Sequence, residues 1–527
     1  MNFGQSNAYD IAIVGSGIAC TSFLLQFLEK LESRPYLKDP ITVAVIEKDE
    51  EFWKGIPYGS RSSPNSLTIT TLGEFVPPSE KRSFLNWLET TLEEWLTYLK
   101  ENGGETAKLW IKNNFLLIEK KQWDDIYIPR YLFGDYINQR IIAAIEKSSL
   151  NNLTSISTIK AEAKNLTRLN NFYEITLEDR LGKNTLISAG KVVLAIGSPP
   201  VKSLPSPAGG THTYAYINDT YSPALEQNLG CIESVLSAVK DQHRRNILIL
   251  GSNASSLELL YLIDTNSDLK KLLNKIVVIS YSGKLPYRIT PHKNNGYEFE
   301  YLLSLKSIKK FTPVALMSAI EKDIGIADDK GVHIGNVYYP LNDLVVDLLN
   351  EMDEGEQKFF YDNYGQKFSK LIRRAGAEYK DAASNLEKAG KLEMVQGAFH
   401  KLELPAIAEK GVCVTYTLPG NGKEITYPLE FPLVINCGGF EELSNSSSSL
   451  IKAIISKKLC VANSNRGVEV NENFEAEKGL YIIGPLLGGI FNSKARLWHV
   501  ENAKSIFYLG NLLADTVLKA LRVQELC

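Results

Sequence analysis

The 527-residue chain has 44% hydrophobic and 23% charged residues and a formal net charge of −3, as is ordinary for a soluble protein. This balance gives no basic surface for nucleic acid or an anionic membrane, and no stretch reaches the ~20 apolar residues of a membrane helix. The N-terminus lacks a signal-peptide pattern, so we expect a cytoplasmic protein. The six cysteines and six histidines show no metal-ligand spacing, which predicts no metal site.

The first candidate site is a glycine turn near the N-terminus. Residues Ile11–Leu28 read IAIVGSGIACTSFLLQFL, an apolar strand that passes through the turn into an apolar helix. Gly15 would make the tight turn, and Gly17 would let the backbone approach a pyrophosphate at the positive helix end. Cys20 replaces the usual third glycine and is small enough for helix–strand packing. The predicted cofactor-binding residues of this turn are Gly15, Ser16, Gly17, Ile18 and Ala19.

An acidic residue near the end of the next strand supports a dinucleotide site. The strand Ile41–Asp49 reads ITVAVIEKD, and the Glu47 carboxylate could bond a ribose hydroxyl. The spacing from Gly17 to Glu47 is longer than the usual ~20 residues, which fits an insertion after the helix. The alternative is a solvated carboxylate at a strand end. We predict that Glu47 and its neighbour Lys48 contact the cofactor.

A second segment follows the same plan. Residues Ile247–Ile263 read ILILGSNASSLELLYLI, and the apolar strand Lys275–Gly283 follows them. Gly251 matches the first glycine of the motif, while Asn253 replaces the second; Asn tolerates positive φ better than most residues with a side chain. The chain therefore carries two candidate dinucleotide-binding units. The predicted contacts of the second are Gly251, Asn253 and Ser255.

Three further strands run into glycines, and one region is mostly helical. The strands are Lys191–Pro200, Pro432–Phe440 and Gly479–Gly489. Residues Ala315–Lys391 show mostly helical spacing, which predicts an inserted helical region. Gly209, Gly210 and nearby prolines indicate a linker near residues 198–212.

Four longer stretches carry a family resemblance. They are Gly55–Leu88 (GIPYGS…), Ile126–Ile137 (IYIPRYLFGDYI), Ile279–His292 (ISYSGKLPYRITPH) and Gly479–Gly489 (GLYIIGPLLGG). Together with the two glycine turns, they resemble the two-dinucleotide FAD–NAD(P)-binding proteins related to flavin-dependent monooxygenases, of the class B-like, N-hydroxylating type. The resemblance spans most of residues 9–515. The Pro-Arg element and the C-terminal strand are its more specific parts.

The resemblance implies an α/β fold with two Rossmann-like units. The FAD-binding domain would be discontinuous, with an N-terminal part at residues 1–210 and a C-terminal part at residues 395–527. An NAD(P)-binding-like domain, with the helical insertion, would occupy residues 211–394 between them.

The resemblance also implies roles around the flavin. Arg130 opens an apolar helix, where it would pair with a phosphate or with an acidic partner, and a structural ion pair is equally favoured. A helix over Ser493–Leu513 would present its N-terminus to the pyrimidine edge of the flavin. Beyond the first turn, the predicted FAD contacts are Gly55, Tyr58, Arg130, Gly197, Gly484, Gly488 and Gly489.

The second glycine turn would hold NADPH or NADH. Tyr281 stands where the family has an arginine for the 2′-phosphate, and Lys284 and Arg288 lie close enough in sequence to substitute. These departures leave open that the second unit is a scaffold without a nucleotide. His292 and His499 are candidates near the nicotinamide and the flavin, and for both a packed core histidine is the favoured alternative.

These features together predict a FAD-dependent oxidoreductase. The leading hypothesis is an NAD(P)H-using monooxygenase that hydroxylates a small-molecule substrate with O2, for example at nitrogen. Two alternatives remain: a flavin dehydrogenase or oxidase without nicotinamide, and a non-catalytic FAD-binding accessory protein. The sequence identifies neither the substrate, the catalytic residues nor the oligomeric state.

Overall fold

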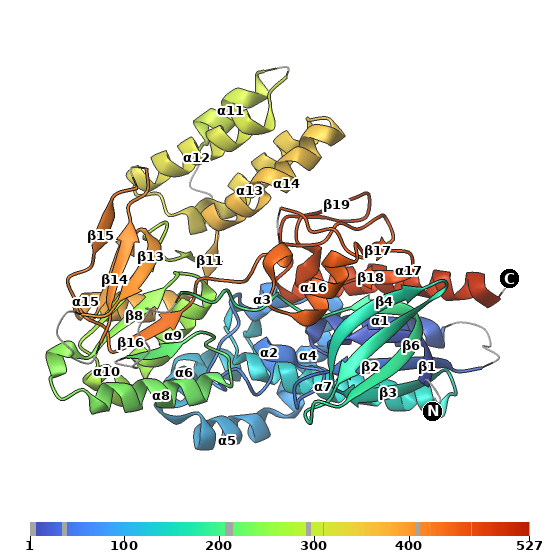
Figure 1. Ribbon diagram of the computed structural model, residues 1–527. Coiled ribbons are helices and arrows are strands. Elements are labelled where there is room, and N and C mark those ends of the chain that lie inside the picture. Colours follow the sequence, from blue (N-terminus) through green and yellow to red (C-terminus); the bar gives the residue numbers. More distant parts are fainter. Residues whose placement is uncertain are drawn as a thin grey trace.

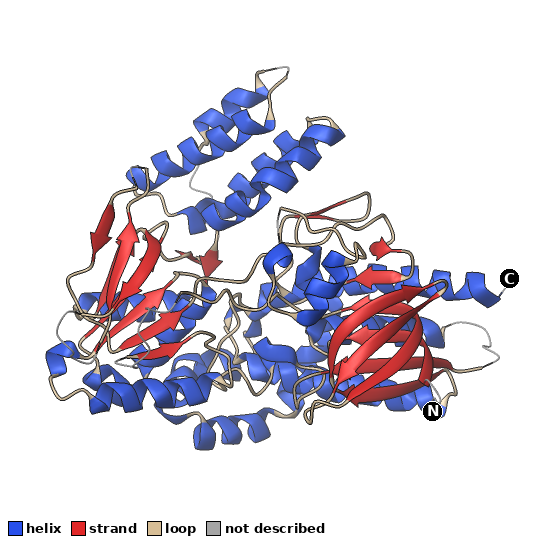
Figure 2. Ribbon diagram, viewed as in Figure 1, coloured by secondary structure: helices blue, strands red, loops and turns tan. Residues whose placement is uncertain are grey.

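The computed structural model describes residues 7–33, 39–205, 214–290, 297–308, 310–405, 411–420, 422–464 and 466–525. Residues 206–212 of the predicted linker and His292 lie outside these ranges. A helical region rises above the rest of the chain (Figure 1), and Figure 2 shows two groups of strands that stand apart with helices between them. None of the described helices is long and apolar enough to cross a membrane.

The first sheet has the strand order β17-β18-β6-β1-β2-β3, and its neighbours from β18 to β3 pair in parallel. Two more strands form an antiparallel extension on β6. The central strands are buried apolar runs, as expected for a parallel sheet with both faces covered. The strands are β1 (Asn7–Val14), β2 (Ile41–Glu47), β3 (Thr154–Lys160), β4 (Glu162–Leu169), β5 (Phe172–Glu178), β6 (Asn184–Leu194), β17 (Glu475–Glu477) and β18 (Leu480–Ile482).

The second sheet repeats this order as β12-β9-β8-β16-β7, and its pairings are all parallel. In both sheets the strand before the glycine turn is internal. β1 has β2 and β3 on one side and β6, β18 and β17 on the other, and β8 has two strands on each side. This is the order of a Rossmann unit, so the predicted α/β class with two such units is confirmed. The strands are β7 (Ala215–Ile217), β8 (Asn246–Leu250), β9 (Lys275–Ser280), β12 (Leu392–Gln396) and β16 (Leu433–Asn436).

Sheet membership differs from the predicted boundaries of the units. β16 lies beyond residue 394, yet it pairs with β8 and β7 of the second sheet, and the described strands rejoin the first sheet only at β17. An apolar strand that ends in glycines suits either sheet, so the pattern at Pro432–Phe440 could not assign its partner. Between β12 and β16 an antiparallel sheet packs against the second sheet in one apolar cluster. Its strands are β13 (Ala398–Glu403), β14 (Cys413–Thr417) and β15 (Glu424–Thr426).

Helices cover both sheets. In the first unit, α1 packs between α7 and α17. The described helices of this unit are α1 (Ile18–Glu32), α2 (Gly55–Tyr58), α3 (Leu72–Phe75), α4 (Pro78–Thr90), α5 (Leu92–Asn102), α6 (Gly104–Glu119), α7 (Arg130–Leu150), α16 (Ser449–Ser456) and α17 (Ala503–Glu525). Those of the second are α8 (Leu225–Ala238), α9 (Ala254–Thr265), α10 (Ser267–Leu272) and α15 (Ala377–Lys388), of which α9 and α15 pack together.

A helical insertion is present and has its own apolar core, but this core spans Phe299–Ile372 rather than the predicted Ala315–Lys391, because α15 packs on α9 in the second unit. Although it lies within the sequence of the second unit, it packs against the C-terminal segment of the first. The Trp498 ring lies 5.2 Å from the rings of Tyr361 and Phe368, and a Cβ atom at Gly365 would lie 2.7 Å from that of Trp498. The insertion therefore bridges both units. Its helices are α11 (Glu300–Lys306), α12 (Pro313–Asp329), α13 (Ile334–Asn350) and α14 (Glu354–Leu371).

The predicted helix over Ser493–Leu513 is wrong at its start. The chain first forms a short hairpin of β19 (Ile490–Phe491) and β20 (Arg496–Leu497). The Asn492 side chain accepts from two following backbone N–H groups at 2.8 and 3.0 Å, which competes with a helix. α17 begins only at Ala503, where the Asn502 side chain accepts from the Ser505 N–H at 2.7 Å.

Candidate dinucleotide-binding sites

The first glycine turn lies at the carboxyl edge of the first sheet, between β2 and β6. Gly15 has φ +91°, and a Cβ atom there would lie 2.5 Å from the Ala195 carbonyl oxygen, so only glycine fits. Its N–H donates to the Ile46 carbonyl at 2.8 Å. Gly197 follows with φ +76° and open space where a side chain would stand. The turn thus occupies the point at which the strand order reverses, where open α/β sheets bind dinucleotides.

Glycines from distant parts of the chain meet at the start of α1. Gly17 precedes this helix and gives it no side-chain cap. Gly55 has φ +64°, and a Cβ atom there would lie 3.0 Å from the Gly17 Cα. Gly484 has φ +83°, and a Cβ atom there would lie 2.9 Å from the Ala19 Cβ. Backbone rather than side chains therefore faces the helix start, and its N–H groups and positive end fit a pyrophosphate.

Glu47 holds the first turn from the end of β2. The N–H and the hydroxyl of Ser16 both donate to one of its carboxylate oxygens at 2.8 Å, and the Asp49 N–H donates to the other at 3.0 Å. The alternative of a solvated carboxylate does not describe this geometry. Ser16 is fully buried, and both of its hydrogen-bond donors are engaged by Glu47. Lys48, which follows Glu47 in the sequence, is exposed. Contact of these residues with a cofactor stays a prediction.

Tyr58 belongs to an aromatic cluster under the same site. Its ring lies edge-on to Phe133 and Phe75, with centroids at 5.2 and 6.0 Å. A Cβ atom at Gly134 would lie 2.1 Å from the Tyr58 carbonyl oxygen, which explains the glycine in the Pro-Arg element. Burial raises the pKa of Tyr58 to about 12, so its hydroxyl stays protonated at neutral pH. The residue supports the backbone of α2 by packing.

The last two predicted glycines lie between β18 and the hairpin of β19 and β20. The Gly488 carbonyl accepts from the Asn463 side-chain amide at 2.8 Å, and the Gly489 N–H donates to the Leu497 carbonyl at 3.0 Å. Of the three predicted glycines that follow β18, Gly484 is the one that lies against α1. Nearby, the partly buried His499 ring makes a 3.0 Å hydrogen bond with the Ser369 hydroxyl, and burial lowers its pKa. This geometry matches the packed histidine that we favoured.

Arg130 pairs with an acidic residue of the second unit. Its Nη2 lies 2.7 and 2.9 Å from the two carboxylate oxygens of Glu258, and the two side chains are only 10% and 3% exposed. The Ser62 hydroxyl accepts from Arg130 at 2.8 and 3.0 Å, and the hydroxyls of Ser66 and Tyr221 donate to Glu258. We call these five residues the inter-unit cluster. The equally favoured acidic partner is thus present, while phosphate contact by Arg130 stays a prediction.

The second glycine turn repeats the backbone of the first. The Gly251 N–H donates to the Ile279 carbonyl at 2.8 Å, and a Cβ atom at Gly251 (φ +104°) would lie 2.2 Å from the Cys437 carbonyl oxygen. Asn253 has φ −90° and ψ −161°, close to the −70° and −171° of Gly17. Our expectation that a positive φ matters here is wrong, because the backbone is extended and accepts any residue. Asn253 is exposed and makes no side-chain cap on α9.

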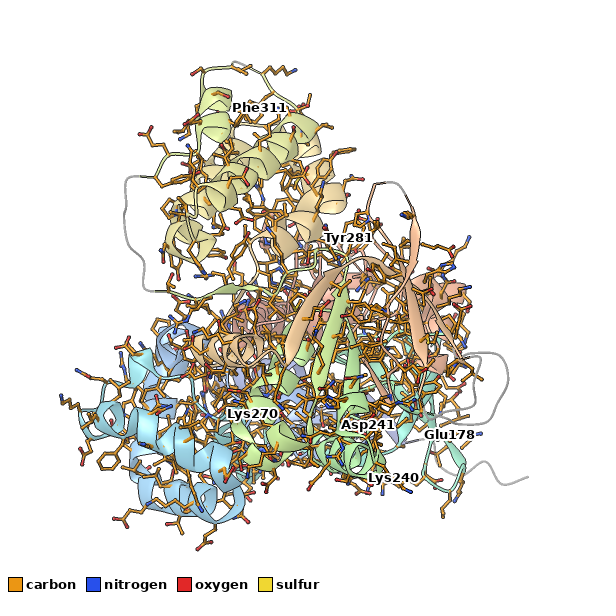
Figure 3. The ribbon with its side chains drawn as sticks, turned by 90° about the vertical axis from the view of Figure 1, so that its left-hand side faces the viewer. Glu178, Lys240, Asp241, Lys270, Tyr281 and Phe311 are labelled. Carbon is orange, nitrogen blue, oxygen red and sulfur yellow. The ribbon has the colours of Figure 1, made fainter. Side chains whose placement is uncertain are left out.

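The basic residues proposed for a 2′-phosphate are both ion-paired. Lys284 lies 2.8 Å from Asp328, and Arg288 lies 2.8 Å from Asp381. Tyr281 is 71% exposed, and Figure 3 shows it at the end of the second sheet nearest the helical insertion.

Sequence reasoning did not single out two carboxyl groups that the structure buries. Glu258 is a single acid in the apolar helix segment LELLYLI, and this was the available signal. Glu378 had none, because it stands in an ordinary polar helix start. Its Oε2 is buried with no hydrogen-bond partner among the described residues, and burial raises its pKa from 4.5 to about 7. The described residues contain no group of three or more His, Cys, Asp or Glu able to hold a metal ion.

Comparison with known proteins agrees with this geometry. Residues 12–199, which hold the first turn, Glu47, Arg130 and Gly197, match the model of a family described as FAD-NAD(P)-binding. The chain is 38% identical over 515 residues to uncharacterized proteins of Mycobacterium tuberculosis and Mycobacterium bovis, covering 98% of this chain and 96% of theirs. The chain belongs to the FAD–NAD(P)-binding family. The description of this family names FAD and NAD(P), which are the cofactors that the sequence predicted.

A solved structure shares the fold over its whole length. It is the ornithine N-hydroxylase of Kutzneria sp. 744, with reduced FAD, NADP+ and L-ornithine. The identity is 13%, the TM-score is 0.53, and the match covers 98% of this chain and 100% of the hydroxylase. The FAD–NAD(P)-binding protein is therefore similar in fold to a two-nucleotide flavoenzyme.

Proposed function

We propose that this protein is an NAD(P)H-using flavin monooxygenase that hydroxylates a small molecule at a nitrogen atom. The observation that carries the proposal is the presence of two matching glycine turns, at the carboxyl edges of two sheets, in one chain. In this proposal the second turn would hold the nicotinamide nucleotide that reduces the flavin. The fold shared with an ornithine N-hydroxylase supports nitrogen as the acceptor.

The chain's own residues would bind and orient the cofactor and enclose the reacting groups. The start of α1, with Gly17, Gly55 and Gly484 around it, would hold the FAD pyrophosphate, and Glu47 would keep the turn in place through Ser16. The helical insertion, which packs on Trp498, would help to exclude water from the reacting groups. Bound FAD would accept a hydride from the nicotinamide and activate O2 for transfer of one oxygen atom.

The second turn favours NADPH over NADH. Gly15 bonds to Ile46 and Gly251 bonds to Ile279 in the same way, so Ser280 occupies the position of Glu47. A carboxylate at this position would bond a ribose 2′-hydroxyl and repel a 2′-phosphate. Ser280 removes that repulsion, which supports NADPH.

A flavin oxidase or dehydrogenase without nicotinamide is the second candidate. It is favoured by the engagement of Lys284 and Arg288 in ion pairs, which leaves each committed to an aspartate. A non-catalytic FAD-binding protein would share the first turn and differ only in lacking turnover.

The test begins with purified protein and FAD. We expect a flavin absorbance spectrum, its anaerobic bleaching by NADPH faster than by NADH, and O2 consumption that yields an amine product heavier by one oxygen atom. Failure of both nucleotides to bleach the flavin would favour the second candidate. Peroxide as the sole product across an amine panel would contradict the monooxygenase.

A further inference from the structure

The inter-unit cluster connects the helix behind the second glycine turn to the first unit. Glu258 lies in the second turn of α9, which starts directly after Asn253. Its carboxylate receives hydrogen bonds from Arg130 at the start of α7 and from Ser66 in the loop between α2 and α3. α9 is therefore held to the first unit by directional contacts, close to the turn that would bind the nicotinamide nucleotide.

Other contacts flank the cluster and also join the two units. The Tyr379 hydroxyl of α15 donates to the Leu67 carbonyl at 2.9 Å and accepts from the Leu67 N–H at 2.8 Å. Tyr379 in turn packs edge-on to Tyr261 of α9, with centroids 5.2 Å apart. On the other side, the Leu225 N–H of α8 donates to the Arg61 carbonyl at 2.9 Å. A sliding movement between the units would break these contacts together.

The buried pair is suited to fixing geometry rather than to adding stability. A buried ion pair gains little over apolar residues of similar size, because both charges lose their hydration. Separation of the pair leaves two buried charges without partners, which is strongly unfavourable. The arrangement is thus satisfied only when α7 and α9 keep one relative position.

We propose that Glu258, held by Arg130, is a positioning residue that fixes the second unit so that a nucleotide at the Gly251 turn meets the flavin in one placement. This rests on the proposed function, in which one hydride, carrying two electrons, passes from the dihydronicotinamide ring to the oxidised flavin. Such a transfer needs the two rings in contact, and a displacement of about 1 Å costs on the order of 100-fold in rate.

The experiment compares three variants of the full-length protein loaded with FAD. Glu258→Gln removes one charge, and the double variant Arg130→Met/Glu258→Leu removes both and leaves no buried charge unpaired. The matched control is Asp264→Asn, which breaks a 2.6 Å ion pair between α9 and Lys270 inside the second unit. Three quantities are measured: the FAD-to-protein ratio, the anaerobic rate of flavin reduction at saturating NADPH, and hydrogen exchange of residues 62–67 and 221–225.

We expect the FAD ratio to stay at the wild-type value in Glu258→Gln and Asp264→Asn. The double variant also removes Arg130, a predicted FAD contact, so its reduction rate is measured on the FAD-bound fraction. Flavin reduction should slow at least about tenfold in the double variant, whereas Asp264→Asn should stay within about twofold. Amides in the two measured segments should exchange faster in the double variant and not in Asp264→Asn. A double variant with wild-type reduction rate and exchange would overturn the proposal. If neither NADPH nor NADH reduces the wild-type flavin, the proposed function fails, and hydrogen exchange alone then decides whether the cluster fixes the units.

Discussion

The two glycine turns share a backbone and differ in the side chains around it. The N–H groups of Gly15 and Gly251 donate to carbonyls near the ends of β2 and β9, respectively. On the other side, the two glycines pack against the carbonyl oxygens that follow β6 and β16. The position of the third glycine holds Cys20 in one unit and Ser256 in the other, both fully buried. The comparison teaches that the repeated scaffold fixes where a dinucleotide fits, while a few side chains decide which one.

The largest expected effect is the separation of the two sites by substitution of their first glycines. Gly15→Ala and Gly251→Ala each place a Cβ atom within 2.5 Å of a carbonyl oxygen at positive φ. We expect Gly15→Ala to lose most bound FAD. Gly251→Ala should keep FAD and lose flavin reduction by NADPH about 100-fold. Equal FAD content in the two variants, measured by absorbance, would mean that the turns do not serve different nucleotides.

A smaller effect tests the end of the second strand. Ser280→Glu gives the second unit the carboxylate that the first has at Glu47. We expect the ratio of kcat/KM for NADPH to that for NADH to fall about 10- to 100-fold, or roughly 1.4 to 2.7 kcal/mol. Ser280→Ala is the control and should leave the ratio within a few-fold. An unchanged ratio in Ser280→Glu would show that the second unit does not bind ribose in this way.

The helices that lead to the third strand of each sheet also differ, and pH exposes the difference. α7 opens with Arg130, whereas the second residue of α15 is Glu378. Burial raises the Glu378 pKa from 4.5 to about 7. This effect outweighs the hydrogen bond from the residue's own backbone N–H, which lowers the pKa. The folded protein therefore holds the proton more tightly than the unfolded chain, and stability falls as pH rises from about 4.5 to 7.

Glu378→Gln should remove this loss. We expect the difference in Tm between the variant and the wild type to increase from pH 5 to pH 8. This corresponds to a relative gain on the order of 2 kcal/mol in the free energy of unfolding. Glu387→Gln, at an exposed position on the same helix, serves as a control. Parallel Tm curves for wild type and Glu378→Gln across this range would contradict a buried, proton-holding carboxyl group.

The smallest effect concerns Cys20. Cys20→Gly restores the usual third glycine but adds flexibility and removes a buried side chain, so we expect a loss of about 1 kcal/mol in stability. FAD content should stay at the wild-type level, whereas Gly17→Val should abolish it. A matching loss of flavin in both variants would assign Cys20 to the phosphate site rather than to helix packing.

Sequence patterns predicted the local parts of this molecule well. The apolar strand, glycine turn and apolar helix occur at both predicted places, because these features depend on residues close in sequence. The same reasoning placed Gly17, Gly55 and Gly484 in one site, although only the family resemblance connected them. The start of α17 was missed because the Asn492 turn competes with a helix that composition alone would favour.

Long-range pairing could not be predicted from one sequence. β16 has the pattern of either sheet, and only its hydrogen bonds to β8 assign it. Arg130 was recognised as a residue in need of a partner, but nothing in either motif links it to Glu258. The expectation for Asn253 failed for a different reason: the residue type suggested a strained backbone that the turn does not require at that position.

The packing of α17 on α1 has a consequence for the order in which the chain folds. Lys30 of α1 pairs with Asp515 of α17 at 2.6 Å, so the helix that opens the first turn receives its cover from the last part of the chain. Strands β7 to β16 of the second sheet all leave the ribosome before β18 and α17 are made. The first unit is therefore completed after the second during synthesis. Until α17 has been made, the apolar face of α1 lacks its native cover.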